Sequence, residues 1–249
     1  MVPFVLLTSP RSGSTWVVDT LATHPQVTAY GEVFMPGRTR DPRWGAQGFP
    51  FYARYLQDRT RRAHPLTPTT YLRALYRSTD ARAVGFKLMY GQARRHPSVA
   101  AYLGLRRVRV VHLIRENGLD VALSRRAAAE RRVTSHADAA GAPETVRLIV
   151  PTQALVQELR AHERSVRMAR RMLRAARMPV LELTYEQLFS DTAANLESIL
   201  GFLGLEPDSR SVAPRLRKVN VSGHAERIAN YEDVRRVLTE AGFGSLLRD

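Results

Sequence analysis

The stretch from Thr8 to Trp16 reads TSPRSGSTW; it follows the apolar run VPFVLL and leads into VVDTLATHP. An apolar run, a turn of small residues and a helical pattern in this order are typical of a strand, an anion-binding loop and a helix whose N-terminus faces the anion. The phosphate loop of nucleoside triphosphatases has the spacing G-x-x-x-x-G-K-[ST]. Here no lysine precedes Ser14 and Thr15, and Arg11 stands early in the loop instead.

The residue types of this loop suit an anionic group. Gly13 allows the backbone to approach the anion closely, and the following helix offers free N–H groups and the positive end of its dipole. The guanidinium group of Arg11 can donate bidentate hydrogen bonds to phosphate or sulfate oxygens. Three hydroxyl side chains complete the set, those of Ser12, Ser14 and Thr15. The alternative is an ordinary strand-to-helix turn, but the coincidence of these features favours an anion site.

The composition allows one domain over residues 1–249, with 44% hydrophobic residues. We expect no transmembrane segment, because no apolar run reaches 18 residues, and no signal peptide, because the start MVPFVLLTSPR lacks a basic region. The absence of cysteine excludes disulfides and thiolate metal sites and fits a cytoplasmic protein.

The formal net charge is +15, and 36 of the 38 basic residues are arginines, which is typical of a GC-rich genome. The excess also suits anionic ligands or an acidic surface. We expect no nucleic acid as partner, because the chain lacks interleaved basic and aromatic residues and any known nucleic-acid-binding motif. A basic nucleic-acid-binding module nevertheless stays open as an alternative.

Continuous apolar runs alternate with helical patterns along the chain, which predicts an α/β fold with a central parallel sheet flanked by helices. The expected strands are residues 4–8, 27–30, 83–89, 108–114 and 180–184, and the expected helices are 14–24, 119–131, 152–177 and 193–203. Residues 33–82, rich in proline, arginine and aromatics, and the polar stretch 134–144 lie outside this pattern. We expect both to cover a substrate site.

A second anion-binding element is expected in VRVVHLIRENGLDVALSR, residues 108–125. The predicted strand ends at Arg115, and Ser124 lies one or two turns into the next helix. Both side chains could bind a further phosphate at the carboxyl edge of the sheet. Each residue alone is equally typical of a protein surface.

Four segments together resemble the sulfotransferases that use 3′-phosphoadenosine 5′-phosphosulfate (PAPS). TSPRSGSTW resembles their 5′-phosphosulfate loop, LIRENGLDVALS their 3′-phosphate motif, and LTYEQLFSDTAANLESILGFLGL their Y-E-D-L segment. VNVSGHAERIANYEDVRRVL is similar to the C-terminal part of bacterial members that sulfate carbohydrates. We expect no metal, because the chain has no Walker-type aspartate paired with a loop lysine and few ligands for a transition metal. The resemblance implies a P-loop-like fold with PAPS as sulfuryl donor and donor contacts from residues of the first two segments. These are Pro10, Arg11, Ser12, Gly13, Ser14, Thr15, Trp16, Arg115 and Ser124.

The chain departs from the cytosolic animal branch of this family at two points. Arg115 and Ser124 are one residue further apart, and the stretch GFKLMYG lacks that branch's catalytic histidine. The longer spacing resembles that of the bacterial trehalose and nodulation-factor sulfotransferases. The resemblance therefore implies a carbohydrate, or a glycosylated or lipid natural product, as the hydroxyl acceptor. With such an acceptor, we expect the aromatics of residues 33–82 to stack on sugar faces.

Sulfuryl transfer by in-line attack needs a base for the acceptor hydroxyl and cations at the leaving group. We choose Glu32 as base, because it follows the predicted strand 27–30 and would lie near the loop if that strand runs beside the first. Related carbohydrate and tyrosylprotein enzymes carry a glutamate here. His24, expected to cap a helix end, and His112, expected to be a satisfied core histidine, are rivals.

At the leaving group we choose Arg11 and Lys87, since a lysine in a chain with so many arginines suits a point contact with one oxygen. Lys218, the other lysine, and Tyr185 are weaker candidates for donor contacts. The resulting prediction is an enzyme, a PAPS-dependent sulfotransferase. Its alternative among enzymes is a P-loop nucleotide kinase or NTPase.

Overall fold

The computed structural model describes residues 1–35, 49–57, 64–130, 147–212 and 223–247. Contacts divide the chain into two compact units, Met1–Ile114 with Ala169–Pro214, and Arg115–Met168 with Arg215–Asp249. Each unit is described by itself below, and the assignment of residues 1–249 to one domain stays a prediction. Within the described ranges, no helix is long and apolar enough to cross a membrane.

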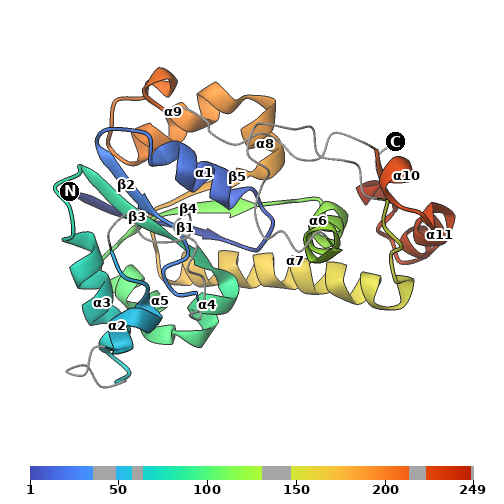
Figure 1. Ribbon diagram of the computed structural model, residues 1–249, viewed down its shortest axis with the longest axis horizontal. Coiled ribbons are helices and arrows are strands. Elements are labelled where there is room, and N and C mark those ends of the chain that lie inside the picture. The colour runs from blue at the N-terminus through green and yellow to red at the C-terminus, as the bar shows by residue number, and fades with distance from the viewer. Residues whose placement is uncertain (36–48, 58–63, 131–146, 213–222, 248–249) are drawn as a thin grey trace. The chain divides into compact units, whose positions relative to one another are not determined.

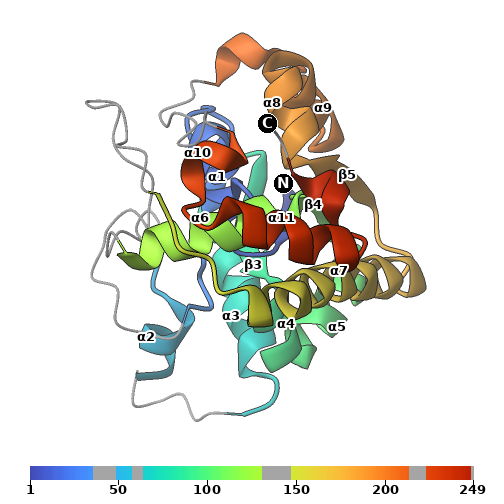
Figure 2. The same cartoon turned by 90° about the vertical axis from the view of Figure 1, so that its right-hand side faces the viewer.

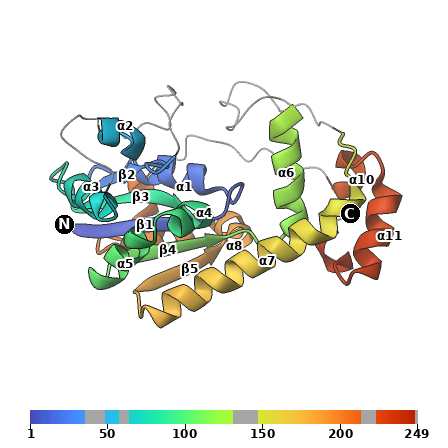
Figure 3. The same ribbon diagram turned by 90° about the horizontal axis from the view of Figure 1, so that it is seen from below.

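The first unit is built on a sheet of five parallel strands in the order β2-β3-β1-β4-β5, seen side by side in Figure 3. The strands are β1 (Val2–Thr8), β2 (Val27–Tyr30), β3 (Ala83–Met89), β4 (Arg109–Ile114) and β5 (Val180–Thr184). The sequence predicted all five, with differences only at the starts of β1 and β4. The central strands are almost fully buried, as their continuous apolar runs require.

Strand β1 lies between β3 and β4, although both follow it much later in the chain. The chain therefore builds one side of the sheet with β2 and β3 and then passes β1 to place β4 and β5 on the other side. Ligands of such sheets bind at the carboxyl ends of the strands where the strand order reverses in this way. Phe4 pairs with Gly85 on β3, where a Cβ atom would lie 2.5 Å from the Phe4 ring. The ring thus occupies the space that a side chain at position 85 would need.

Helices cover both faces of this sheet (Figures 1 and 2). Helices α1 (Ser14–Leu21), α8 (Tyr185–Ser190) and α9 (Thr192–Phe202) lie on one face, and α3 (Thr67–Tyr76), α4 (Tyr90–Arg95) and α5 (Pro97–Leu105) lie on the other. The unit also contains α2 (Tyr52–Gln57) and the short 3-10 helix η1 (Ser209–Ser211). The sequence predicted α1 and α9 as helices, but missed α4, α5 and α8.

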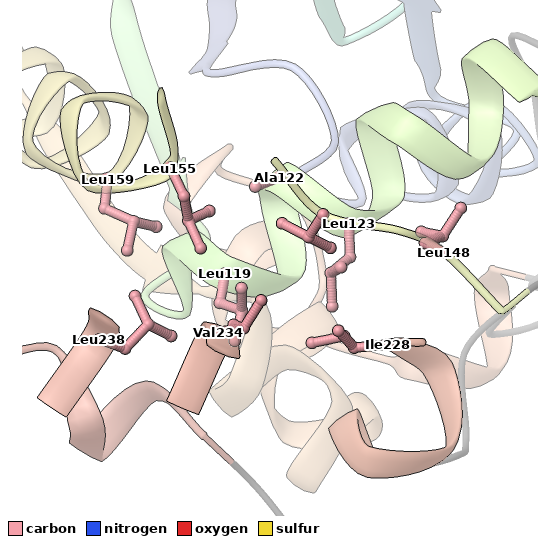
Figure 4. Close-up of a cluster of buried hydrophobic side chains, with 10 residues drawn as sticks. Leu119, Ala122, Leu123, Leu148, Leu155, Leu159, Ile228, Val234 and Leu238 are labelled. Carbon is pink, nitrogen blue, oxygen red and sulfur yellow. The ribbon is translucent and has the colours of Figure 1, made fainter. Parts of the chain in front are cut away.

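The second unit contains α6 (Gly118–Glu130), the first part of α7 (Thr152–Ala175), α10 (His224–Arg227), α11 (Tyr231–Glu240) and the 3-10 helix η2 (Gly244–Leu246). Its core joins side chains from α6, α7 and α11, and Figure 4 shows Leu119 and Leu159 directed toward Val234 and Leu238. A parallel bridge between Leu148 and Ile228 closes this core. Segments distant in sequence thus share one hydrophobic cluster.

The described aromatics of residues 33–82 differ from the expectation that they stack on sugars. Tyr52, Tyr55 and Tyr71 are buried, and their rings pack on one another and on Phe34. They form a satellite core because the rings exclude water from one another. Residues 36–48, 58–63 and 134–144, for which covering of the acceptor was expected, lie outside the described residues, as does Lys218.

Candidate active site

The predicted anion loop follows β1 and is tightly folded. The hydroxyl of Thr8 donates to the carbonyl of Leu113 on β4 at 2.7 Å and also contacts the Ser12 hydroxyl. Ser12 in turn donates to the carbonyl of Ser9 at 2.9 Å. Arg11 and Gly13 both have left-handed backbone conformations, with φ of 66° and 80°. The reversals at these two positions turn the chain from the strand into helix α1.

Gly13 stands immediately before α1, beside an aromatic side chain from a distant segment. A Cβ atom at position 13 would lie 2.7 Å from Cδ2 of Tyr185, the first residue of α8. The Tyr185 ring packs on Phe189 at 4.5 Å, and Phe189 packs on Trp16 at 5.0 Å between ring centroids. The structure thus brings the predicted donor residues Trp16 and Tyr185 to the same loop.

The loop fits an anionic group on the evidence of its own polar atoms. The hydroxyl of Ser9 is buried and has no hydrogen-bond partner among the described residues. Ser14 and Thr15 open α1, where the first N–H groups of a helix have no intrahelical acceptor. A buried donor without an acceptor costs free energy unless a ligand supplies one, so these groups suit a phosphate or sulfate. Pro10 lies at the exposed edge of the loop.

Lys87 brings a second cation, besides Arg11, to a loop that has no lysine of its own. It lies on β3 beside Leu6 of β1, and its side chain is 2% exposed. Its Nζ donates to the hydroxyl of Thr15 at 3.1 Å and lies 3.2 Å from Oε1 of Glu32. Burial lowers the pKa of Lys87, while the charge of Glu32 opposes this shift and that of Arg11 adds to it. In a Walker sequence the lysine belongs to the loop itself. Here the lysine that contacts the loop comes from the neighbouring strand β3.

Glu32 lies close to the loop, but for a different reason from the one expected. Strand β2 does not run beside β1, because β3 lies between them. The carbonyl of Gly31 accepts from the backbone N–H of Lys87 at 3.2 Å, which holds Glu32 against β3. The proximity of Glu32 to the loop is therefore mediated by Lys87.

The second oxygen of Glu32 has a partner that the sequence did not reveal. Nε2 of Gln92 donates to Oε2 of Glu32 at 3.0 Å. Gln92 lies in the first turn of α4, and its Oε1 accepts from the backbone N–H of Met89 at 3.0 Å. The sequence did contain one signal for this contact. A glutamine three residues after the end of a predicted strand is typical of a residue that caps the start of a helix.

The two rival histidines have structural roles. His112 is fully buried on β4, with Nδ1 2.9 Å from Glu182 and Nε2 2.7 Å from the hydroxyl of Tyr90. Burial lowers the pKa of His112 against the opposing effect of Glu182, so the neutral ring donates to Glu182 and accepts from Tyr90. The prediction of a satisfied core histidine is confirmed. Nδ1 of His24 accepts from the N–H of Gln26 and so closes the turn before β2 rather than capping α1.

The second unit holds Arg115 and Ser124, both buried. Nη2 of Arg115 lies 3.3 Å from Oδ2 of Asp120, whose Oδ1 contacts Nε2 of His224 at 3.2 Å and Nη1 of Arg227 at 3.0 Å. Burial alone would raise the pKa of Asp120, but the hydrogen bond from His224, the charge of Arg115 and the hydrogen bond from Arg227 lower it well below its ordinary value. One carboxylate therefore joins the start of α6 to α10.

The sequence did not reveal the roles of Asp120, His224 and Arg227, since the last two lie about a hundred residues beyond the first. No group of three or more histidine, aspartate or glutamate side chains suited to a metal ion occurs in the described part of the chain. The loop, Lys87, Glu32 and Tyr185 form the candidate active site of the first unit. The Arg115 cluster belongs to the second unit.

Comparison with known proteins identifies the family. The model described as "Sulfotransferase family" matches residues 3–209, most of the chain. A sulfotransferase from Alicyclobacillus acidocaldarius, known from its crystal structure, is 17% identical in sequence. The alignment covers 99% of this chain and 92% of that protein's chain, with a TM-score of 0.54. The likeness shows a shared P-loop-like α/β fold. A search of curated proteins found no match. From the family match over residues 3–209, we conclude that the chain is an enzyme of the sulfotransferase family.

Proposed function

We propose that the protein transfers a sulfuryl group from PAPS to a hydroxyl of a carbohydrate, or of a glycosylated or lipid natural product. The observation that carries this proposal is the chain of contacts from Thr15 through Lys87 to Glu32, with distances of 3.1 and 3.2 Å. These contacts hold a carboxylate and an ammonium group beside the anion loop, and sulfuryl transfer requires a base and a cation.

The loop residues would hold the phosphosulfate end of the donor. The buried hydroxyl of Ser9 and the N–H groups at the start of α1 offer donors to its oxygens, and Arg11 and Lys87 offer positive charge. The ring of Tyr185 against Gly13 offers a surface to the nucleotide. For the 3′-phosphate we propose Arg115 and Ser124, and more weakly Lys218, on the basis of the sequence motifs alone.

When bound, PAPS supplies the sulfuryl group, whose bond to the phosphate oxygen breaks as the bond to the acceptor oxygen forms in line with it. Glu32 takes the proton of the acceptor hydroxyl on a carboxylate oxygen. Lys87 and Arg11 stabilise the negative charge that the leaving phosphate gains. The residues described here require no metal for these roles, because each is performed by a side chain of the loop, β3 or the end of β2.

The acceptor class rests on the features that the chain shares with the bacterial carbohydrate branch. A glutamate follows β2 where Glu32 stands. The longer spacing between Arg115 and Ser124 points to the same branch. We likewise propose a bacterial enzyme that acts in the cytoplasm on small molecules or glycans.

The test is Glu32→Gln, which keeps the shape of the side chain and removes its ability to take a proton. Turnover should fall by about 10²–10⁴-fold. The acceptor for this assay comes from a panel of sugars, glycosides and glycolipids incubated with ³⁵S-labelled PAPS. Binding of adenosine 3′,5′-bisphosphate, measured by calorimetry, should stay near that of the wild type. Normal turnover of Glu32→Gln would remove Glu32 as base.

A kinase or NTPase and a nucleic-acid-binding module are the competing functions. A kinase would need ATP and magnesium for turnover, and a nucleic-acid module would bind DNA with a steep salt dependence and no turnover. Titrations of PAPS and ATP with and without magnesium, together with DNA binding at two salt concentrations, separate the three. Tight binding of PAPS without magnesium is the result expected.

A further inference from the structure

We propose that Gln92 is a positioning residue of this active site, which holds the carboxylate of Glu32 in the orientation for taking a proton from the acceptor. The proposal rests on the proposed role of Glu32 as base. It concerns the oxygen of Glu32 that Lys87 does not contact, because Nε2 of Gln92 donates to Oε2 at 3.0 Å while Lys87 lies 3.2 Å from Oε1.

The two contacts of Gln92 fix which way its amide faces. Its Oε1 accepts from the N–H of Met89 at 3.0 Å, and its Nε2 donates to Glu32. If the amide were turned over, an N–H₂ group would meet the N–H of Met89 and a carbonyl oxygen would meet the carboxylate. Both contacts would then be repulsive, so the backbone of β3 and the carboxylate together select one orientation.

One strand-to-helix turn supplies both groups that hold Glu32. Lys87 lies two residues before Met89, the last residue of β3, and Gln92 lies three residues after it in α4. Glu32, Lys87 and Gln92 are all buried. A displacement of this turn would therefore move the cation and the amide together relative to the carboxylate.

The neutrality of Gln92 matters for its role. A second cation at this position would stabilise the carboxylate of Glu32 and so oppose its uptake of a proton. An amide donates a hydrogen bond and fixes the position of the oxygen without adding a charge. Errors of about 1 Å in the position of a reacting group cost up to about 100-fold in rate. We therefore expect the loss of Gln92 to lower turnover rather than donor affinity.

The chain offers a matched control in Gln187. Its Oε1 accepts from the N–H of Thr184 at 3.0 Å at the start of α8, as that of Gln92 does from Met89 at the start of α4. Gln187 is exposed, and no hydrogen bond from its Nε2 to a carboxylate is present among the described residues. Gln92→Leu and Gln187→Leu thus each remove a helix cap of the same kind. Only Gln92→Leu also removes a hydrogen bond to a carboxylate, that of Glu32.

The experiment compares these two variants alone and, for Gln92→Leu, combined with Glu32→Gln. Turnover is measured on the acceptor found by the panel, and affinity for adenosine 3′,5′-bisphosphate by calorimetry. We expect Gln92→Leu to lower kcat by about 10- to 100-fold with unchanged bisphosphate affinity, and Gln187→Leu to leave kcat unchanged. In the Glu32→Gln background, Gln92→Leu should cause no further loss, because the two residues act through one carboxylate.

A measurement without acceptor accompanies the kinetics. In ¹⁵N-edited NMR spectra, the side-chain N–H resonance of Gln92 should move toward its free-solution position in Glu32→Gln, and that of Gln187 should not move. Additive losses of kcat, a normal kcat for Gln92→Leu, or an unmoved Gln92 resonance would overturn the proposal. Normal turnover of Glu32→Gln would instead overturn the role of Glu32 as base, so the two failures are distinguishable.

Discussion

Lys87 and Glu32 form a buried ion pair, with Nζ 3.2 Å from Oε1 and side chains that are 2% and 10% exposed. Removal of one partner of a buried pair leaves the other as an uncompensated charge, which typically costs about 3–5 kcal/mol of folding free energy. Variants of either residue therefore change stability as well as chemistry. Turnover and thermal melting must be measured together to separate the two effects.

Lys87→Arg should lose nearly as much kcat as Lys87→Ala. The guanidinium keeps the charge, but its larger planar group does not fit the space that Nζ occupies between Thr15 and Glu32. An interaction made mainly in the transition state lowers kcat and kcat/KM together when it is lost. Steady-state kinetics at temperatures below each variant's Tm measure this effect.

Lys218→Arg is the control for Lys87→Arg, since it makes the same exchange at the other lysine. We expect it to be mild and to act mainly through PAPS affinity. A fully active Lys87→Arg enzyme with a normal Tm would contradict the role of Lys87 and leave Arg11 as the main cation at the leaving group.

Adenosine 3′,5′-bisphosphate should bind far more tightly than AMP, because the second phosphate is assigned to Arg115 and Ser124. Ser124→Ala removes one hydrogen bond to a charged group, which is worth roughly 1.5–3 kcal/mol. The variant should therefore lose affinity for the bisphosphate while its affinity for AMP stays constant. Calorimetry with both nucleotides is the measurement, and equal affinities of the wild type for the two would contradict the assignment.

Asp120→Asn should change the pH dependence of the free energy of unfolding. The pKa of Asp120 is lowered from its ordinary value of 3.8, so the folded state favours the carboxylate. Its contribution to stability is fully present above that value and is lost as the pH falls below it toward the lower pKa of the folded state. Asp120→Asn should lose stability at neutral pH and show a shallower loss of stability between about pH 4 and pH 2.

Asp208→Asn is the matched control for this effect. Asp208 also pairs with an arginine, Arg210 at 2.9 Å, but at the surface, where screening makes ion pairs weak. Urea unfolding at a series of pH values should show the change for Asp120→Asn only. An unaltered pH dependence in Asp120→Asn would mean that the carboxylate does not carry the acid sensitivity of the second unit.

Gly13→Ala should disrupt the loop, because the residue has φ of 80° and a Cβ atom would meet the ring of Tyr185 at 2.7 Å. We expect a loss of bisphosphate affinity of at least tenfold, which corresponds to about 1.4 kcal/mol, and a lower Tm. Gly91→Ala in α4 is the control, since nothing lies within 4 Å of its added atom. It should keep the affinity and the Tm of the wild type.

Local sequence patterns were sufficient to predict the strands and the loop. The runs that become β1, β3 and β4 are apolar enough to be buried on both faces, and the glycine and hydroxyl residues around Gly13 mark the anion loop. Helices α4 and α5 were missed because α4 has only six residues and α5 has no distinct polar face. Short helices gain their stability from packing, which a local pattern does not contain.

Contacts between distant segments were the part that the sequence could not provide. The sequence did not show that β3 lies between β1 and β2. Glu32 was therefore expected near the loop through pairing of β2 with β1, which does not occur. Gln92 and His224 are ordinary residues until the fold brings them to Glu32 and Asp120. Lys87 was the exception, because a lysine is rare in this chain and its rarity was itself a signal.

The packing of Phe4 over Gly85 favours one alignment of strands β1 and β3. A strand that is apolar on both faces can slide along its neighbour at little hydrophobic cost, and a slip of one residue turns every side chain to the opposite face. The ring of Phe4 fits only where β3 carries no side chain, so one alignment of β1 and β3 is favoured over its neighbours. Lys87 lies two residues after Gly85 and therefore on the same face. Because Gly85 has no side chain, it favours the alignment in which the ammonium group of Lys87 lies on this face of the sheet.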